Sequence, residues 1–191
     1  MKKLALLLVL SGIMLAGPTS AMAEDHSHGM TIFGRLEPTK SGCTVLMSKY
    51  VLNLNHDDTS LPNQGTQANT SSADDHIYIQ LGGENCDADQ GYSKIGLKFL
   101  GTTDDAQKIS LGNISTASDA AKGIGVQLSD MFGQFIIPNL TVAHFFGSNH
   151  DAQPTNQPAS FPLFFTLVHL RDQATTPGKV QTNMTVQIER L

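Results

Sequence analysis

The chain has 191 residues, and its 12 lysines and arginines against 17 aspartates and glutamates give a formal net charge of −5. It contains no basic run and no stretch of arginines interleaved with aromatic residues, which excludes the usual signature of a nucleic-acid-binding protein. The length suits one domain with a substantial core better than two.

The N-terminus has the three parts of a secretory signal peptide. Lys2 and Lys3 precede an apolar run over residues 4–16, and the small-residue motif Ala-Met-Ala follows at residues 21–23. The apolar run is too short to cross a membrane. We therefore predict that residues 1–23 are removed and that the product is exported without inserting into a membrane.

Residues 24–41 are predicted to form an N-terminal arm that contains one β-strand. Its apolar or small residues alternate with Thr31, Phe33, Arg35 and Glu37, and they are Met30, Ile32, Gly34 and Leu36. Successive side chains of a strand point to opposite faces, so a period of two predicts a strand. The alternative is a disordered tail in which the alternation arises by chance.

The sequence has two cysteines, Cys43 and Cys86. Disulfides persist in the oxidising environment that an exported protein meets, so we predict that the two residues pair. In the chain-entropy model, closing a loop of this size stabilises the fold by about 4 kcal/mol. The alternative is a pair of buried free thiols.

Residues 42–191 contain short apolar–polar alternations separated by loops rich in turn-forming residues. The predicted strands fall within residues 44–54, 76–81, 95–99, 109–111, 123–128, 135–137 and 161–170. Polar stretches over residues 57–73 and 147–160 are predicted to be loops. Short strands at this spacing favour an all-β fold, an immunoglobulin-like antiparallel β-sandwich.

Two other groups of residues have an expected environment. The acidic pairs at residues 57–58, 74–75 and 104–105 are typical of solvated turns rather than of binding sites. The large apolar residues that follow residue 130 are expected to pack in the core. They are Met131, Phe132, Phe135, Phe145, Phe146, Phe161, Phe164 and Phe165.

The C-terminal stretch, residues 178–191, has the longest alternation in the chain. Val180, Met184, Val186 and Ile188 share one face, and Gln181, Asn183, Thr185, Gln187 and Glu189 share the other. This pattern predicts a half-buried strand. The strand fits either a complete sandwich or one whose edge is left open.

Four sequence motifs occur in order along the mature chain. They are Ile32-Phe33-Gly34-Arg35-Leu36 followed by Cys43-Thr44-Val45, then Ile77-Tyr78-Ile79-Gln80-Leu81 before Cys86, then residues 123–130 with Gly133, and finally Gly178-x-Val180 through Ile188. Together with the signal peptide and the cysteine pair, they resemble the pilin subunits of chaperone–usher fimbriae, the superfamily of type 1 and P fimbriae. The resemblance covers essentially the whole mature chain.

This resemblance implies an immunoglobulin-like sandwich that lacks its final strand and has an open groove beside the C-terminal strand. A periplasmic chaperone would fill the groove first, and the arm of the next subunit would then replace it, which is a recognised case of β-augmentation. The donor residues would be Met30, Ile32, Gly34 and Leu36. The acceptor groove would be lined by Val45, Met47, Val180, Met184, Val186 and Ile188.

The resemblance also implies partners and a location. The partners would be the chaperone, an outer-membrane usher and neighbouring pilin subunits, and the product would reach the fimbrium on the bacterial cell surface and contribute to adhesion. The sequence departs from the family pattern at Arg190, where these subunits usually carry a tyrosine that belongs to the chaperone- and usher-recognition surface. Extra residues between Gly34 and Cys43 and a long polar loop favour a minor, adaptor or terminal subunit.

The sequence carries none of the common catalytic or nucleotide-binding motifs, so we expect neither an enzyme nor a cofactor. Cleavage after residue 23 would place His26 third from a free N-terminus, where an imidazole can complete a Cu(II) or Ni(II) site. We favour instead a polar lead-in to the arm, without a metal. The rival interpretation of the whole chain is a self-contained secreted β-sandwich that binds a small ligand or metal.

Overall fold

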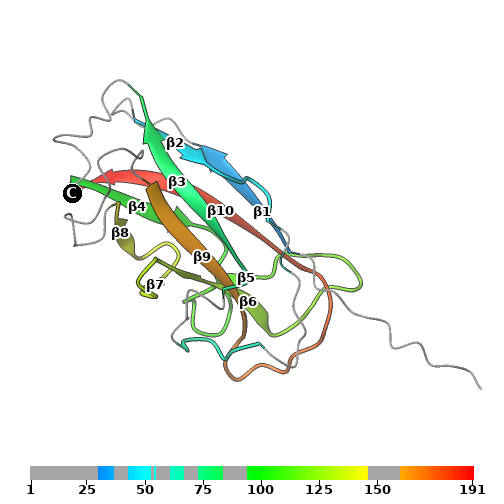
Figure 1. Cartoon of the computed structure of the whole chain (residues 1–191). Helices are drawn as coiled ribbons and strands as arrows, with labels where there is room; N and C mark the ends of the chain where they lie inside the picture. Colours follow the sequence, from blue (N-terminus) through cyan, green and yellow to red (C-terminus); the bar gives the residue numbers. More distant parts are fainter. Residues whose placement is uncertain are drawn as a thin grey trace, which may run out of the picture.

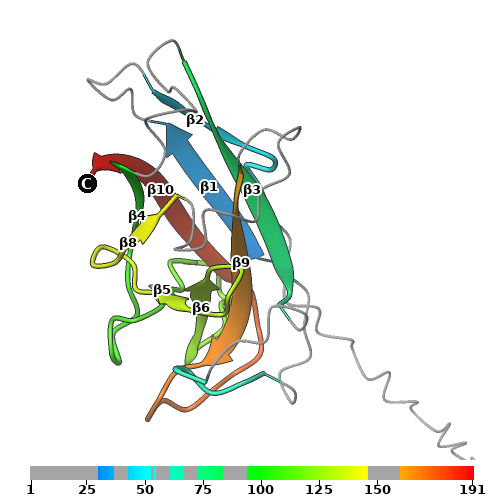
Figure 2. The same ribbon diagram turned by 60° about the vertical axis from the view of Figure 1, so that its left-hand side comes forward.

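Two facing β-sheets make up the part of the chain that the computed structural model describes (Figures 1 and 2). That part consists of residues 43–52, 54, 61–66, 73–83, 94–145 and 160–191, with the backbone of residues 30–36. The predicted signal peptide, His26, Cys86 and Phe146 lie outside the described residues. Among the described residues, no helix has the length and apolar character needed to cross a membrane.

The first sheet has the strand order β1-β10-β4-β8. Its strands are β1 (Met30–Leu36), β4 (Ile95–Leu100), β8 (Val142–His144) and β10 (Val180–Arg190). The second sheet has the order β2-β3-β9-β6-β5, and β7 pairs with β6. Its strands are β2 (Thr44–Met47), β3 (Asp75–Gly82), β5 (Leu111–Gly112), β6 (Ile124–Ser129), β7 (Phe135–Ile136) and β9 (Ser160–His169). All the strand pairs are antiparallel except β1 with β10.

The core lies between the two sheets and is built from alternate residues of the longer strands. The side chains of Phe161, Leu163 and Phe165 on β9 face the core, and so do those of Ile77 and Ile79 on β3. Burying each such side chain stabilises the fold by about 1.5–3 kcal/mol relative to exposure. The predicted all-β fold with antiparallel pairing is therefore confirmed.

The aromatic prediction is confirmed in part. Phe145, Phe161 and Phe165 are at most 5% exposed. Met131 and Phe132 are 50% and 48% exposed, so the prediction that they pack in the core is wrong. They lie in the turn between β6 and β7, whose backbone is held by hydrogen bonds to a carboxylate rather than by apolar packing.

Strand β2 is shorter than its sequence pattern predicts. The alternation over residues 44–54 continues as a strand only to Met47. The bend that follows changes which side chains face inward, so Val51 is 46% exposed whereas Leu52 and Leu54 are buried. The alternation predicted within residues 44–54 therefore fails at Val51.

Part of the predicted polar loop is built into the fold. The backbone N–H of Gln64 donates to the carbonyl of His169 at 2.8 Å, and the N–H of His169 donates to the carbonyl of Pro62 at 2.9 Å. The N–H of Gly65 donates to Oε1 of Gln127 on β6 at 2.9 Å. Residues 61–66 therefore dock onto the second sheet through β6 and β9.

In the acidic pair at residues 104–105, Asp105 is exposed in a turn as predicted, whereas the prediction is wrong for Asp104. Asp104 is 2% exposed, and its Oδ2 accepts hydrogen bonds from Gln64 Nε2 at 2.9 Å and from the N–H of Ser110 at 2.9 Å. Its Oδ1 accepts hydrogen bonds from the N–H groups of Ala106, Gln107 and Lys108. A carboxylate can be buried when its oxygens are hydrogen-bonded in this way.

The entry to β10 is fixed by a close backbone contact. A Cβ atom on Gly178 would overlap the carbonyl oxygen of Asp119 and lie within 2.6 Å of the nitrogen of Ala121, so only glycine fits there. The next N–H, that of Lys179, donates to the Asp119 carbonyl at 2.7 Å. The Lys179 ammonium also donates a hydrogen bond to the Asp119 carboxylate, which lowers the pKa of that exposed group.

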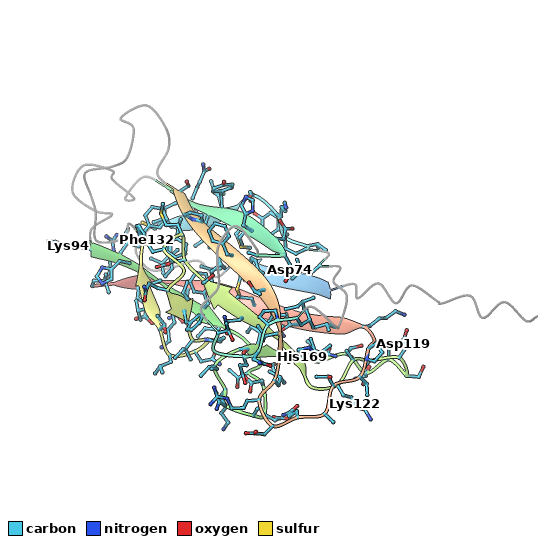
Figure 3. The ribbon with its side chains drawn as sticks, turned by 60° about the horizontal axis from the view of Figure 1, so that its bottom comes forward. Asp74, Lys94, Asp119, Lys122, Phe132 and His169 are labelled. Carbon is cyan, nitrogen blue, oxygen red and sulfur yellow. The ribbon has the colours of Figure 1, made fainter. Side chains whose placement is uncertain are left out.

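Figure 3 shows Asp119 and Lys122 at the opposite end of the sandwich from Lys94 and Phe132.

The Asp104 network leads to a stability prediction. Replacing Asp104 with alanine should lower the free energy of unfolding by about 3 kcal/mol, because it leaves buried N–H donors without an acceptor. Asp105→Ala is the matched control, since Asp105 is exposed in the same turn and should change stability by less than about 0.5 kcal/mol. Urea titration of both variants measures the difference, and equal midpoints would contradict the role given to Asp104.

The contact at Gly178 leads to a second prediction. Gly178→Ala should lower the free energy of unfolding by about 1–3 kcal/mol, because the added methyl group forces the start of β10 away from Asp119. Lys179→Ala removes only an exposed ion pair and should cost less than about 1 kcal/mol. Thermal unfolding of the two variants separates backbone crowding from charge, and an unchanged Gly178→Ala protein would argue against the crowding.

Candidate functional site at the edge of strand β10

The N-terminal strand β1 lies along one edge of β10 in the parallel direction. Seven consecutive residues pair, from Met30 with Val180 to Leu36 with Val186. In this register, the donor positions 30, 32, 34 and 36 stand opposite positions 180, 182, 184 and 186, all of which are buried. Figure 2 shows β1 between β10 and the β2–β3 side of the other sheet. The arm thus occupies the edge of β10 in its own chain.

The pairing of β10 changes along its length. Residues Thr185–Arg190 pair with β4 on the edge away from β1, whereas no described strand takes that place beside residues 180–184. There, the Gln181 N–H donates to Oδ1 of Asn113 at 2.8 Å, and the Gln181 carbonyl accepts from the N–H of Ile114 at 2.7 Å. On the side away from β1, the backbone of β10 therefore pairs with β4 and, at Gln181, with Asn113 and Ile114. On the other edge, residues 180–186 pair with the arm.

The structure brings the six predicted acceptor residues into one buried cluster. Each is at most 8% exposed, and they are Val45, Met47, Val180, Met184, Val186 and Ile188. Met47, at the end of the edge strand β2, and Met184, on β10, line the same small pocket, with Ile77 and Phe165 also in its lining. Side chains from β2 and β10 therefore meet in the core between the two sheets.

Sequence reasoning missed two residues of this region. Leu52, which is 2% exposed, lines the pocket shared by Met47 and Met184. Thr182 is fully buried and faces the core between Val180 and Met184, although it is polar. The alternation of β10 could have identified Thr182, because the side chain at every even-numbered position from 180 to 188 faces the core.

Cys43 and Arg190 meet at the C-terminal end of β10. Cys43 is 1% exposed, and the Arg190 guanidinium donates a hydrogen bond to its sulfur at 3.8 Å. The neighbouring Glu189 forms an ion pair with Lys98 on β4 at 3.8 Å. Because Cys86 lies outside the described residues, the Cys43–Cys86 bridge stays a prediction.

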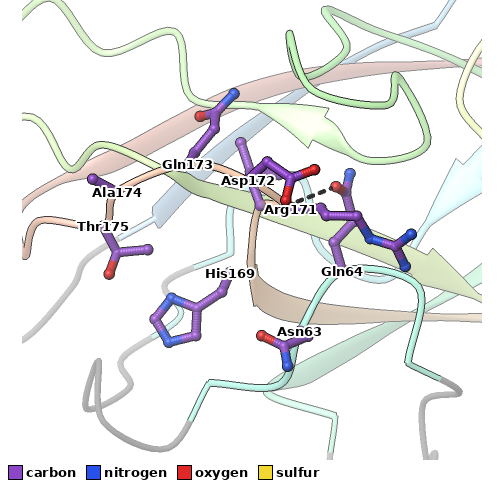
Figure 4. Close-up of a pocket in the computed structure, with 9 residues that line it drawn as sticks. Asn63, Gln64, His169, Arg171, Asp172, Gln173, Ala174 and Thr175 are labelled. Atoms are coloured by element: carbon purple, nitrogen blue, oxygen red, sulfur yellow. Dashed lines mark hydrogen bonds between the residues drawn. The ribbon is translucent and has the colours of Figure 1, made fainter.

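A second concavity opens between residues 61–66 and the chain that follows β9 (Figure 4). It has a volume of about 750 Å³. Its lining is mainly polar and consists of Asn63, Gln64, His169, Leu170, Arg171, Asp172, Gln173, Ala174 and Thr175. The backbone N–H of Arg171 donates to Oε1 of Gln64 at 3.3 Å, which ties the two walls together. Among the described residues, no group of three or more His, Cys, Asp or Glu side chains is placed to hold a metal ion.

Comparisons with known proteins identify the family. A search of curated proteins found no match. The model of the family described as fimbrial protein matches residues 33–189, which include most of β1 and nearly all of β10. The match spans well over half of the chain. The chain therefore belongs to the fimbrial protein family and is a structural subunit that assembles with other pilin subunits into a surface appendage.

Proposed function

We propose that this chain is a subunit of a chaperone–usher fimbria and that it polymerises by donor-strand exchange. The signal peptide, residues 1–23, directs export to the periplasm. Residues 24–41 form the donor arm, and residues 42–191 form the incomplete immunoglobulin-like domain that accepts an arm from a neighbour. Adhesion through the assembled fimbria is the resulting activity.

The observation that carries the proposal is the register between β1 and β10. An arm strand laid on this edge has its apolar or small positions opposite the buried positions of β10 over seven residue pairs. Such a strand can form a ladder of main-chain hydrogen bonds and cover the core at the same time. The same surface suits an equivalent strand from a chaperone or from a second subunit.

The chemistry of the edge explains why it needs an occupant. Without β1, residues 180–186 would present unpaired N–H and C=O groups beside buried apolar side chains such as Val180 and Met184. An exposed strand edge of this kind pairs with other chains and aggregates. A periplasmic chaperone would protect the edge until an usher brings the next subunit.

One departure from the family's sequence pattern bears on the position of the subunit in the fibre. Arg190 replaces the tyrosine expected on the chaperone- and usher-recognition surface. Its guanidinium donates a hydrogen bond to the sulfur of Cys43. An arginine engaged at the C-terminal end of β10 offers a different contact from an aromatic ring. This difference supports a minor, adaptor or terminal subunit rather than the abundant subunit of a rod.

Charged substitutions in the arm test the donor role. Ile32→Asp and Gly34→Asp should leave chaperone binding intact but reduce subunit polymerisation about 100-fold or more, because burying an unpaired carboxylate costs several kcal/mol. Polymerisation is measured as the rate of fibre formation from purified chaperone–subunit complexes.

The matched control is Arg35→Asp. Position 35 is registered with Thr185, on the opposite face of β10 from Met184, so a carboxylate there should stay in solvent and leave polymerisation within about threefold of the wild type. Normal polymerisation by Ile32→Asp would contradict the assignment of this arm as the donor.

Removing the arm tests the groove itself. Residues 42–191, refolded with the disulfide oxidised, should melt about 5–10 °C higher when a peptide of residues 25–39 is present at 100 times its Kd. The same peptide with Ile32→Asp serves as the control and should have little effect. A stable domain that does not respond to the wild-type peptide would indicate a complete sandwich.

A second candidate function is binding of a small polar ligand in the cavity of Figure 4. The observation that favours it is a mainly polar lining held between two segments by the Arg171–Gln64 hydrogen bond. This function fits the rival interpretation of a self-contained sandwich. A peptide-insensitive domain in the melting experiment would make the cavity the site to study.

A further inference from the structure

Thr182 places a polar group inside an otherwise apolar groove. It is fully buried at a core-facing position of β10, between Val180 and Met184. Its hydroxyl oxygen has no hydrogen-bond partner among the described residues. A buried hydroxyl without a partner loses its hydrogen bonds to water and gains none in return.

Thr182 differs in this respect from most buried polar side chains of the structure. Gln64, Asp104 and Gln127 each make side-chain hydrogen bonds. The hydroxyls of Ser129 and Thr166 also lack partners, but they lie on β6 and β9 in the other sheet. Thr182 is thus the unpartnered hydroxyl on the strand that forms the acceptor edge.

The neighbour of Thr182 across that edge is the groove occupant. Thr182 is registered with Ile32 of β1, and no described strand pairs with its other edge. An isoleucine side chain has no donor or acceptor to offer. In this register the arm of the same chain therefore supplies main-chain partners along β10 and places an isoleucine at the position paired with Thr182.

We propose that Thr182 is a specificity-determining residue of the groove, which favours a donor arm from another subunit with serine, threonine or asparagine at the position facing Thr182. The inference rests on the proposed donor-strand exchange. A groove that contains a polar group discriminates against an occupant that leaves this group unpaired. The chain's own arm is then the weaker occupant, which favours its replacement during assembly.

A double-mutant cycle in the full chain tests the proposal. Ile32→Thr and Ile32→Val arms have nearly the same shape and differ in the hydroxyl, and each is combined with wild-type Thr182 or with Thr182→Val. A fluorescent peptide of residues 25–39 is titrated against each chain, and the equilibrium constant for displacing the chain's own arm is measured. Because the same peptide competes within each pair, its affinity cancels from the comparison.

With Thr182 present, the Ile32→Thr arm should be about tenfold harder to displace than the Ile32→Val arm, since a hydrogen bond forms between the two hydroxyls. In the Thr182→Val background the order should reverse, because the arm hydroxyl is then buried alone. Thr182→Ser retains the hydroxyl and should behave as the wild type, which guards against an effect of misfolding in Thr182→Val.

Equal ratios in the two backgrounds would overturn the role of Thr182 while leaving strand exchange intact. If the peptide displaces no arm from any of the chains, donor-strand exchange itself fails, and this inference fails with it. The two failures are therefore distinguishable in one experiment.

Discussion

The hydrogen-bonding edge of β10 beside β1 is the constraint on which the rest of the structure depends. Residues 180–186 have their other side satisfied by β4 and by Asn113 and Ile114, and they have alternate side chains buried in the core. The remaining edge needs a strand that supplies both main-chain partners and apolar cover. The arm of this chain meets both needs over seven residue pairs.

The surroundings of this edge are fixed by contacts that do not involve the arm. Gly178 packs against Asp119 and Ala121 and sets where β10 begins. On the other sheet, residues 61–66 are held by hydrogen bonds from Gly65 to Gln127 on β6 and from the Gln64 backbone to His169 on β9. The Gln64 side chain also donates to the buried Asp104 carboxylate. A preorganised acceptor loses little conformational entropy when a strand docks, so more of the docking energy is available for affinity. The frame is therefore suited to exchanging one strand without rebuilding the core.

Much of this arrangement was predictable from alternation alone, because burial on one face imposes a period of two. The inward residues of β10 and the strand at residues 30–36 follow from that rule. Alternation does not reveal strand direction, since the pattern reads the same both ways, so the parallel pairing of β1 with its own chain was not predictable. The rule also failed at Val51, where a bend shifts the parity, and at Asp104, where local backbone donors make burial of a carboxylate possible. Thr182 was overlooked because a polar residue at an inward position breaks the apolar pattern while keeping its parity.

The direction of β1 has a consequence for the origin of any strand found in the groove. Leu36 pairs with Val186, near the end of β10 where Arg190 contacts Cys43, and only residues 37–42 separate Leu36 from Cys43. An antiparallel arm in the same register would put Leu36 beside Val180, roughly 33 Å from that end at about 3.3 Å per residue. The intervening chain spans at most about 25 Å when fully extended. An antiparallel occupant of residues 180–186 must therefore come from another molecule, and it competes with a tethered arm whose effective concentration is on the order of millimolar. An antiparallel strand along this span of β10 thus reports an origin in another molecule.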